Sequence, residues 1–247
     1  MITRHHLVLV LLCSIIISSA IVDFDPFLAV LVSIGMGIGA IIPDIQMKRP
    51  KNNPLRMIAW GMVQAGRRTC IPVICFVYQR FFKTPAKPDD KRVTHSIIGI
   101  LLYFIMLAAI AYILIMLFKN TIPVILVMGL LAGLLSGMLL HLAEDLCCRK
   151  GICLFYPFND TRIYGSIRPC DVLDKRILGF HVYHATVLFF FLVIQSAIHV
   201  SLYEMIAISM FSIGLCVVSM IWQSEVRIGL PESRVTDNQE EIPAKGY

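Results

Sequence analysis

Two side chains that could bind a metal together, His141 and Asp145, lie four positions apart in the chain. On a helix this spacing places them one turn apart on the same face. A neutral imidazole and a carboxylate so placed can share one divalent metal ion. They can equally form a hydrogen-bonded pair in which the carboxylate fixes the tautomer of the imidazole. The pair alone leaves both interpretations open.

The composition is that of a membrane protein. Of the 247 residues, 57% are hydrophobic and 15% are charged, whereas soluble domains carry about 25% charged residues. The charges are segregated and leave several uncharged runs of about 18 or more residues, which is the length of a membrane span. We therefore predict an all-α integral membrane protein.

The net charge of +6 indicates which partners to expect, and the eight cysteines indicate whether disulfide bonds are expected. In a membrane protein with several spans, excess positive charge reflects basic cytoplasmic loops that meet anionic lipid headgroups. No basic stretch is interleaved with aromatic residues, so membrane lipids are expected partners and nucleic acid is not. The cysteines form no CxxC pair and no disulfide-like framework, which predicts small buried side chains or free thiols.

Six apolar runs predict about six transmembrane helices within a domain of residues 1–222. A shorter apolar run, 69–82, predicts an interfacial or re-entrant helix in the first long loop. Residues 223–247 are polar and predicted to be disordered. The six runs are about 6–22, 27–43, 93–118, 121–140, 178–200 and 202–222.

The first run has an alternative interpretation as a cleaved signal peptide. Its start is basic, and Ser18-Ser19-Ala20 offers the small residues that a signal peptidase prefers. Another apolar run follows about four residues after the first, which favours a retained span. Cleavage would remove one span without changing the orientation of the others.

The basic residues predict the orientation. If the N-terminus is cytoplasmic, 21 of the 22 Lys and Arg residues lie on the cytoplasmic side, and only Lys119 lies on the other. The positive-inside rule therefore predicts cytoplasmic N- and C-termini in a multi-pass protein of the cytoplasmic (inner) membrane.

This topology brings several polar helix ends to one surface of the membrane. Imidazoles and carboxylates at hydrocarbon depth are costly unless they are paired or bind a metal. A mixed His/Asp set suits zinc, manganese or iron, and such a metal can activate water. Each residue also has a simpler explanation, such as a helix end for Asp44 or an N-cap for Thr94. The residues at this surface are His5, His6, Asp44, His95, His141, Asp145, His181 and His184, of which the last two could be interfacial anchors.

Glycines mark two of the predicted spans. Gly35, Gly37 and Gly39 lie in the second run, and Gly129, Gly133 and Gly137 recur at every fourth position of the fourth. Small residues at such spacing let transmembrane helices approach closely.

Three motifs together resemble a known family. They are Ile42-Pro43-Asp44-Ile45, then Thr94-His95-Ser96, then His141-x3-Asp145-x5-Gly151-Ile-x-Leu-Phe-Tyr-Pro157. Over about residues 5–165 the chain is similar to the YdjM/YbcI-like family of membrane-bound, predicted metal-dependent hydrolases. The last motif is the most specific, because its spacing holds over 17 positions.

The resemblance implies a metal centre at the cytoplasmic membrane face. Its ligands would be His6, Asp44, His95, His141 and Asp145, and the expected metal is zinc. The implied activity is hydrolysis of a lipid or another phosphoester. Four basic residues, Arg92, Arg149, Lys150 and Arg162, would hold an anionic headgroup.

The chain also departs from the family pattern. Gln46 and Met47 stand where the family has Asp and His, and Asp90-Lys91-Arg92 replaces a His-Arg-Gly triplet. Asp90 could serve as a substitute oxygen ligand. A non-catalytic scaffold or stress protein with a degenerate site is therefore the alternative function. Transport is less favoured, because the predicted spans are apolar in their middles, with Gln195 as the main exception.

Overall fold

The computed structural model describes residues 3–44, 54–88, 90–118, 123–169 and 174–229. Gln46, Met47 and the part of the predicted tail beyond residue 229 lie outside these ranges. Within them, each of the six predicted apolar runs contains a helix, and two short strands pair as an antiparallel ribbon. The elements are α1 (Thr3–Ile21), α2 (Pro26–Ile41), α3 (Pro54–Phe81), α4 (Lys91–Thr94), α5 (Ile97–Leu117), α6 (Val124–Leu146), β1 (Arg162–Tyr164), α7 (Arg176–Ala197), α8 (Leu202–Gln223) and β2 (Arg227–Gly229).

The apolar helices fall into two groups by length. Four of them, α5, α6, α7 and α8, are each long and apolar enough to cross a bilayer, while α1 and α2 are shorter apolar helices. Large apolar side chains such as Ile105, Leu117 and Phe211 are exposed on their outer faces. A continuous apolar surface of this kind is stable against lipid rather than water. The chain is therefore an all-α membrane protein, as predicted.

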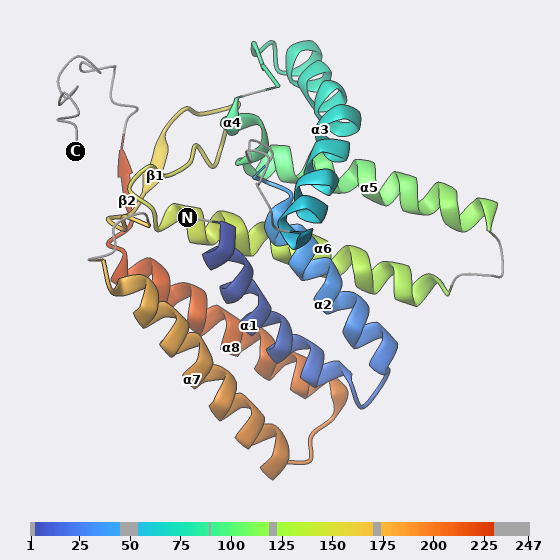
Figure 1. The fold of residues 1–247 in the computed structure, drawn as a ribbon, viewed down its shortest axis with the longest axis vertical. Coiled ribbons are helices and arrows are strands. Elements are labelled where there is room, and N and C mark those ends of the chain that lie inside the picture. The colour runs from blue at the N-terminus through green and yellow to red at the C-terminus, as the bar shows by residue number, and fades with distance from the viewer. Residues whose placement is uncertain (1–2, 45–53, 89, 119–122, 170–173, 230–247) are drawn as a thin grey trace.

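Local capping residues set the tight turns. The Asp25 carboxylate accepts hydrogen bonds from the backbone N–H groups of Phe27 (2.9 Å) and Leu28 (3.1 Å) at the start of α2. Ser201 and Glu204 form a capping box at the start of α8. As a result α1–α2 and α7–α8 are helical hairpins, and α1 packs against both α7 and α8 (Figure 1).

Two predicted helices extend well beyond their expected bounds in the structure. The helix expected over 69–82 begins at Pro54 and includes Pro72 in its interior. Hydropathy detects only its apolar second half, which buries Ile71, Ile74 and Tyr78 in a core with Tyr103 of α5. The fourth predicted span, expected to end near 140, continues as α6 to Leu146. Its last turns stay helical because their polar side chains find partners inside the protein.

Helices α2 and α6 pack closely against each other. Gly35 and Gly39 of α2 lie against the α6 backbone, where an added Cβ would collide with the carbonyl oxygens of Leu130 and Leu134. Conversely, a Cβ on Gly137 of α6 would collide with a backbone carbonyl of α2. The predicted close-packing faces therefore meet one another, whereas Gly37 points into open space.

This difference gives a stability test with a matched control. We expect Gly39→Ala to lower the free energy of unfolding by about 1–3 kcal/mol, because the new methyl group must separate two backbones. Gly37→Ala on the same helix should be neutral or stabilising by up to about 1 kcal/mol, because Ala favours helix and meets nothing there. Denaturant unfolding in mixed micelles measures both. Equal stabilities would contradict the assigned packing.

Candidate metal centre

The structure brings all five predicted metal ligands together at one end of the bundle. His6 lies in the first turns of α1, and Asp44 follows α2. His95 follows the single turn of α4, and His141 and Asp145 lie in the last turns of α6. All three imidazoles are almost fully buried. Metal binding by this group stays a prediction, but its geometric precondition is met.

Asp145 lies at the middle of the group. Its Oδ2 is 3.5 Å from His95 Nε2 and 3.6 Å from His141 Nε2. Its Oδ1 is 3.2 Å from His6 Nε2. One carboxylate therefore faces the same nitrogen of three imidazoles that come from three different segments.

Asp44 supplies the second carboxylate. Its Oδ1 is 3.7 Å from His95 Nε2 and 4.0 Å from His141 Nε2. In each of two overlapping sets of three residues, the candidate ligand atoms lie within 4.8 Å of one another. The sets are His6–Asp44–His141 and His95–His141–Asp145. Because they share His141, they define one centre.

The opposite ring nitrogens are held by the protein. His141 Nδ1 lies 2.7 Å from the carbonyl oxygen of Ala40, and His6 Nδ1 lies 2.6 Å from Glu144 Oε2. These oxygens accept hydrogen bonds, so each Nδ1 donates. His95 Nδ1 lies 3.1 Å from the Thr94 hydroxyl, which itself donates to Pro43 O at 3.3 Å.

This arrangement assigns the tautomers of the three imidazoles. With a proton on each Nδ1, a neutral imidazole directs its Nε2 lone pair at the carboxylates. The Nε2 atoms of His6, His95 and His141 are buried and have no hydrogen-bond partner among the described residues. Lone pairs facing carboxylate oxygens repel unless a cation lies between them or the rings are protonated.

Ring stacking favours a cation over protonation of every ring. The rings of His6 and His141 stack with their centroids 4.0 Å apart and their planes inclined by 19°. Two imidazolium rings in that position would repel each other strongly in a buried site. A divalent metal satisfies three Nε2 lone pairs and two carboxylates at once, and Nδ1–H groups bound to the protein are typical of metal-ligating histidines. The residues present therefore fit a metal.

Glu144 belongs to the centre and was not predicted from the sequence. It is 1% exposed, and its hydrogen bond with His6 joins α1 to α6 across 138 positions. The available signal was an acidic residue next to Asp145 at the end of an apolar run, three positions after His141. Its partner could not be found without the packing of α1 against α6.

Asp90, which the sequence allowed as a substitute ligand, pairs with Arg92 in the structure. It begins α4 by accepting a hydrogen bond from Arg92 N at 2.9 Å, and it pairs with the Arg92 guanidinium at 2.8 Å. Partial burial raises the pKa of the Asp90 carboxyl, but the hydrogen bonds from Arg92 outweigh this effect and lower that pKa. Asp90 is absent from the ligand sets found among the described residues.

Other predicted polar residues have structural roles. The N-cap of α5 is Ser96, whose hydroxyl accepts a hydrogen bond from Gly99 N, and not Thr94. The Thr94 hydroxyl instead contacts His95 Nδ1 and Pro43 O. His184 Nδ1 bonds to Phe180 O of its own helix at 2.8 Å. The ring of His181 lies 5.4 Å from that of His5. Neither His181 nor His184 joins the ligand sets of the described residues.

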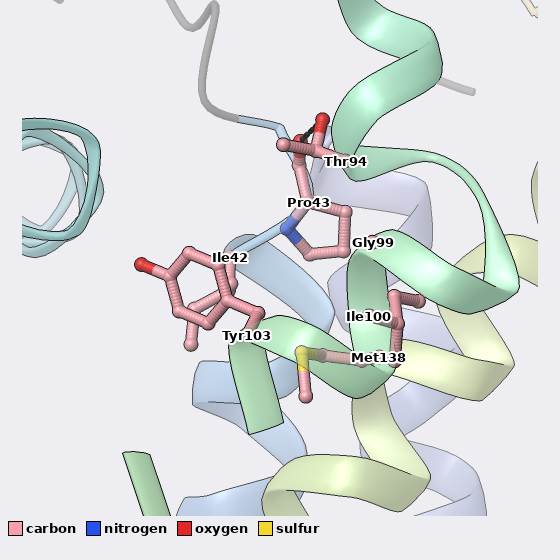
Figure 2. A pocket seen from close by; sticks show the side chains of 7 residues that line it. All are labelled: Ile42, Pro43, Thr94, Gly99, Ile100, Tyr103 and Met138. Atoms are coloured by element: carbon pink, nitrogen blue, oxygen red, sulfur yellow. Dashed lines mark hydrogen bonds between the residues drawn. The ribbon is translucent and has the colours of Figure 1, made fainter. Parts of the chain in front are cut away.

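A small cavity lies against Pro43 and Thr94, which precede the candidate ligands Asp44 and His95 in the chain. Figure 2 shows Thr94 hydrogen-bonded to Pro43 above this cavity, which Ile100, Tyr103 and Met138 also line. This cavity has a volume of about 10 Å³, which is room for a single water molecule at most. None of the candidate metal ligands lines this cavity.

The four predicted headgroup residues do not share one environment. Arg92 pairs with Asp90 and with Asp160 (3.3 Å) and lies 4.9 Å above the Tyr156 ring. Arg149 and Lys150 follow α6 and are exposed, and Arg162 is exposed on β1. Their role in headgroup binding stays a prediction.

A helical bundle with exposed apolar faces and a buried His/Asp centre at one end defines a multi-pass membrane protein with a candidate metal site. The chain belongs to the YdjM inner membrane protein family, whose model matches residues 1–226. Its location is therefore the inner membrane. The comparisons with curated proteins and with solved structures give no match.

The role of Glu144 can be tested through metal affinity. We expect Glu144→Ala to weaken zinc binding about 10- to 100-fold, because His6 loses the acceptor that orients its ring. Glu204→Ala is the control, since it removes an exposed carboxylate from the capping box of α8 and leaves the centre intact. Competition with a zinc-binding dye measures both affinities. Equal affinities in the two variants would exclude an orienting role.

Proposed function

We propose that the protein is a membrane-bound, metal-dependent hydrolase whose centre is formed by His6, Asp44, His95, His141 and Asp145. The observation that carries this proposal is a set of three buried Nε2 atoms, those of His6, His95 and His141. These nitrogens have no hydrogen-bond partner among the described residues, and they face the carboxylates of Asp44 and Asp145. The orienting bonds on the opposite ring nitrogens support it. A divalent cation bound there supplies Lewis-acid chemistry for hydrolysis.

The residues of the centre have two proposed roles, metal binding and proton transfer. His6, His95, His141 and Asp145 would hold the ion, with zinc expected and manganese or iron compatible with the same donors. Five donors exceed the three protein ligands of a typical catalytic zinc site. Asp44 lies furthest from the imidazole nitrogens among the measured pairs, so its carboxylate is the candidate acceptor for a proton from water.

The proposal includes the finer topology. Six membrane-spanning helices with cytoplasmic termini would place the centre at the cytoplasmic face, next to lipid headgroups. The distribution of basic residues supports this orientation. The 16 residues of α2 are short for a span, which local thinning of the bilayer can accommodate. Lipid or other phosphoester substrates follow from this position.

One observation favours a second candidate, a non-catalytic scaffold with a structural metal. The three imidazoles are almost fully buried and the centre offers five protein donors, which could fill the coordination shell of a metal, whereas catalytic zinc sites keep an open position. Metal bound without hydrolysis would be the result expected for this alternative.

Metal content is the first test. Purified protein should carry stoichiometric zinc by elemental analysis, and the double variant His141→Ala/Asp145→Ala should lose it, because both ligand sets are disrupted. His184→Ala/Asp23→Ala is the matched control, since it removes one imidazole and one carboxylate outside the centre and should keep the metal. Wild-type protein without stoichiometric metal after zinc reconstitution would refute both candidate functions.

Hydrolysis is the second test. Zinc-loaded protein should cleave a chromogenic phosphodiester or a phospholipid in nanodiscs. Asp44→Asn should lower kcat about 100-fold, the effect of losing a general base, while metal content is retained. If the wild type holds zinc and cleaves neither substrate, the scaffold alternative gains and the hydrolase proposal fails.

A further inference from the structure

We propose that a second site, separate from the metal centre, binds a phosphate group in a basic cleft where α6 and α8 end. The cleft has a volume of about 280 Å³ and is lined by Arg149, Arg168, Arg227, Tyr164, Ser166 and Glu225. None of these residues belongs to the candidate metal ligands. The inference therefore does not depend on the proposed hydrolase activity.

Three segments far apart in the sequence bring the arginines together. Arg149 follows the end of α6, Arg168 follows β1, and Arg227 lies on β2. Backbone hydrogen bonds hold these segments: Arg149 N donates to Ile167 O at 2.9 Å, and Ser166 N donates to Ser224 O at 2.8 Å. In the ribbon, Tyr164 pairs with Arg227. Backbone hydrogen bonds and strand pairing therefore hold the segments that carry the three arginines next to one another.

Ser166 forms a rigid wall of the cleft. Its hydroxyl donates to Ser224 O at 2.9 Å and accepts a hydrogen bond from the Arg176 guanidinium at 2.6 Å. Arg176 in turn pairs with Asp174 at 2.7 Å. Gly165 beside it lies directly against the backbone carbonyl of Cys147, where a Cβ would collide. The wall is therefore anchored to the ends of both α6 and α8.

The charge inside the cleft is not balanced. Glu225 is the one acidic residue of the lining, and it pairs with Arg227 at 3.1 Å. Among the described residues, no carboxylate lies within ion-pair distance of the Arg149 or Arg168 guanidinium. The Arg92 guanidinium, by comparison, pairs with both Asp90 and Asp160. Asp174 accepts from the backbone N–H of Arg168 at 3.0 Å, but the Arg176 guanidinium already pairs with it and holds the pKa of its carboxyl well below the usual range.

An anion with several oxygens fits this arrangement. The guanidinium fork matches phosphate oxygens through paired hydrogen bonds, which a single ammonium group cannot do. The volume holds a phosphate ester but is too small for a folded partner. The cleft lies where two candidate membrane spans, α6 and α8, end. The ends of membrane-spanning helices lie at the level of the lipid headgroups. A lipid headgroup and a soluble phosphate ester offer the same chemistry.

The test uses the full-length protein and two probes. Inorganic phosphate is titrated calorimetrically into the detergent-solubilised protein, and retention of phosphatidylglycerol is measured by native mass spectrometry from nanodiscs that contain phosphatidylglycerol and phosphatidylcholine. We expect Arg149→Gln and Arg168→Gln each to weaken binding about tenfold, the effect of losing a charge-assisted hydrogen bond. Arg149→Lys should lose part of the affinity, because it keeps the charge without the fork.

Lys175→Gln and Arg80→Gln are the controls, since each removes one exposed positive charge that neither lines the cleft nor belongs to the predicted headgroup residues. Saturable phosphate binding that the cleft variants weaken and the controls keep supports a site for soluble phosphate esters. Selective loss of retained phosphatidylglycerol, without phosphate binding, supports the same site with a lipid headgroup as its ligand. Equal effects of cleft and control variants, or no binding of either probe by the wild type, would overturn the proposal. Thermal unfolding without ligand verifies that each variant is folded. If the Arg149→Gln variant does not fold, Arg149→Lys takes its place in the comparison.

Discussion

The close approach of the α2 and α6 backbones is the constraint on which the candidate metal centre depends. Glycines on both helices allow this approach, since a Cβ on Gly39 or Gly137 would collide with the opposite backbone. The same approach brings Ala40 O to within 2.7 Å of His141 Nδ1 and places Asp44 beside the end of α6. Wider separation would break the bond that orients His141 and remove one of the two carboxylates.

Around this pair, each further segment is attached through a polar contact. His6 of α1 reaches Glu144 of α6, and His95 is oriented by Thr94, whose hydroxyl also contacts Pro43. Buried polar groups are costly in a membrane unless they are all satisfied. Occupation of the centre by a metal would satisfy the remaining Nε2 atoms, so metal binding and the stability of the bundle are expected to be coupled.

The end of α6 joins two environments of opposite character. Asp145 lies in the buried centre, where nitrogen and carboxylate donors suit a cation, while Arg149, four residues later, lines an open cleft that suits an anion. The β1–β2 ribbon and the turn at Gly151, which has φ +54°, fold the chain back so that distant arginines join this cleft. The two proposed sites can therefore be removed separately by mutation.

The sequence by itself determined the apolar helices, the close-packing glycines and the five polar residues that gather at one end of the bundle. Hydropathy and helical spacing are local properties, and the alternation of span direction brings every second helix end to the same side. Only the tertiary structure decided that α3 begins at Pro54, that Asp90 pairs with Arg92, and that Glu144 holds His6. The cleft of Arg149, Arg168 and Arg227 likewise needs the ribbon pairing. Such contacts join residues up to 138 positions apart, and the spacing of a motif carries no information about a partner on another helix.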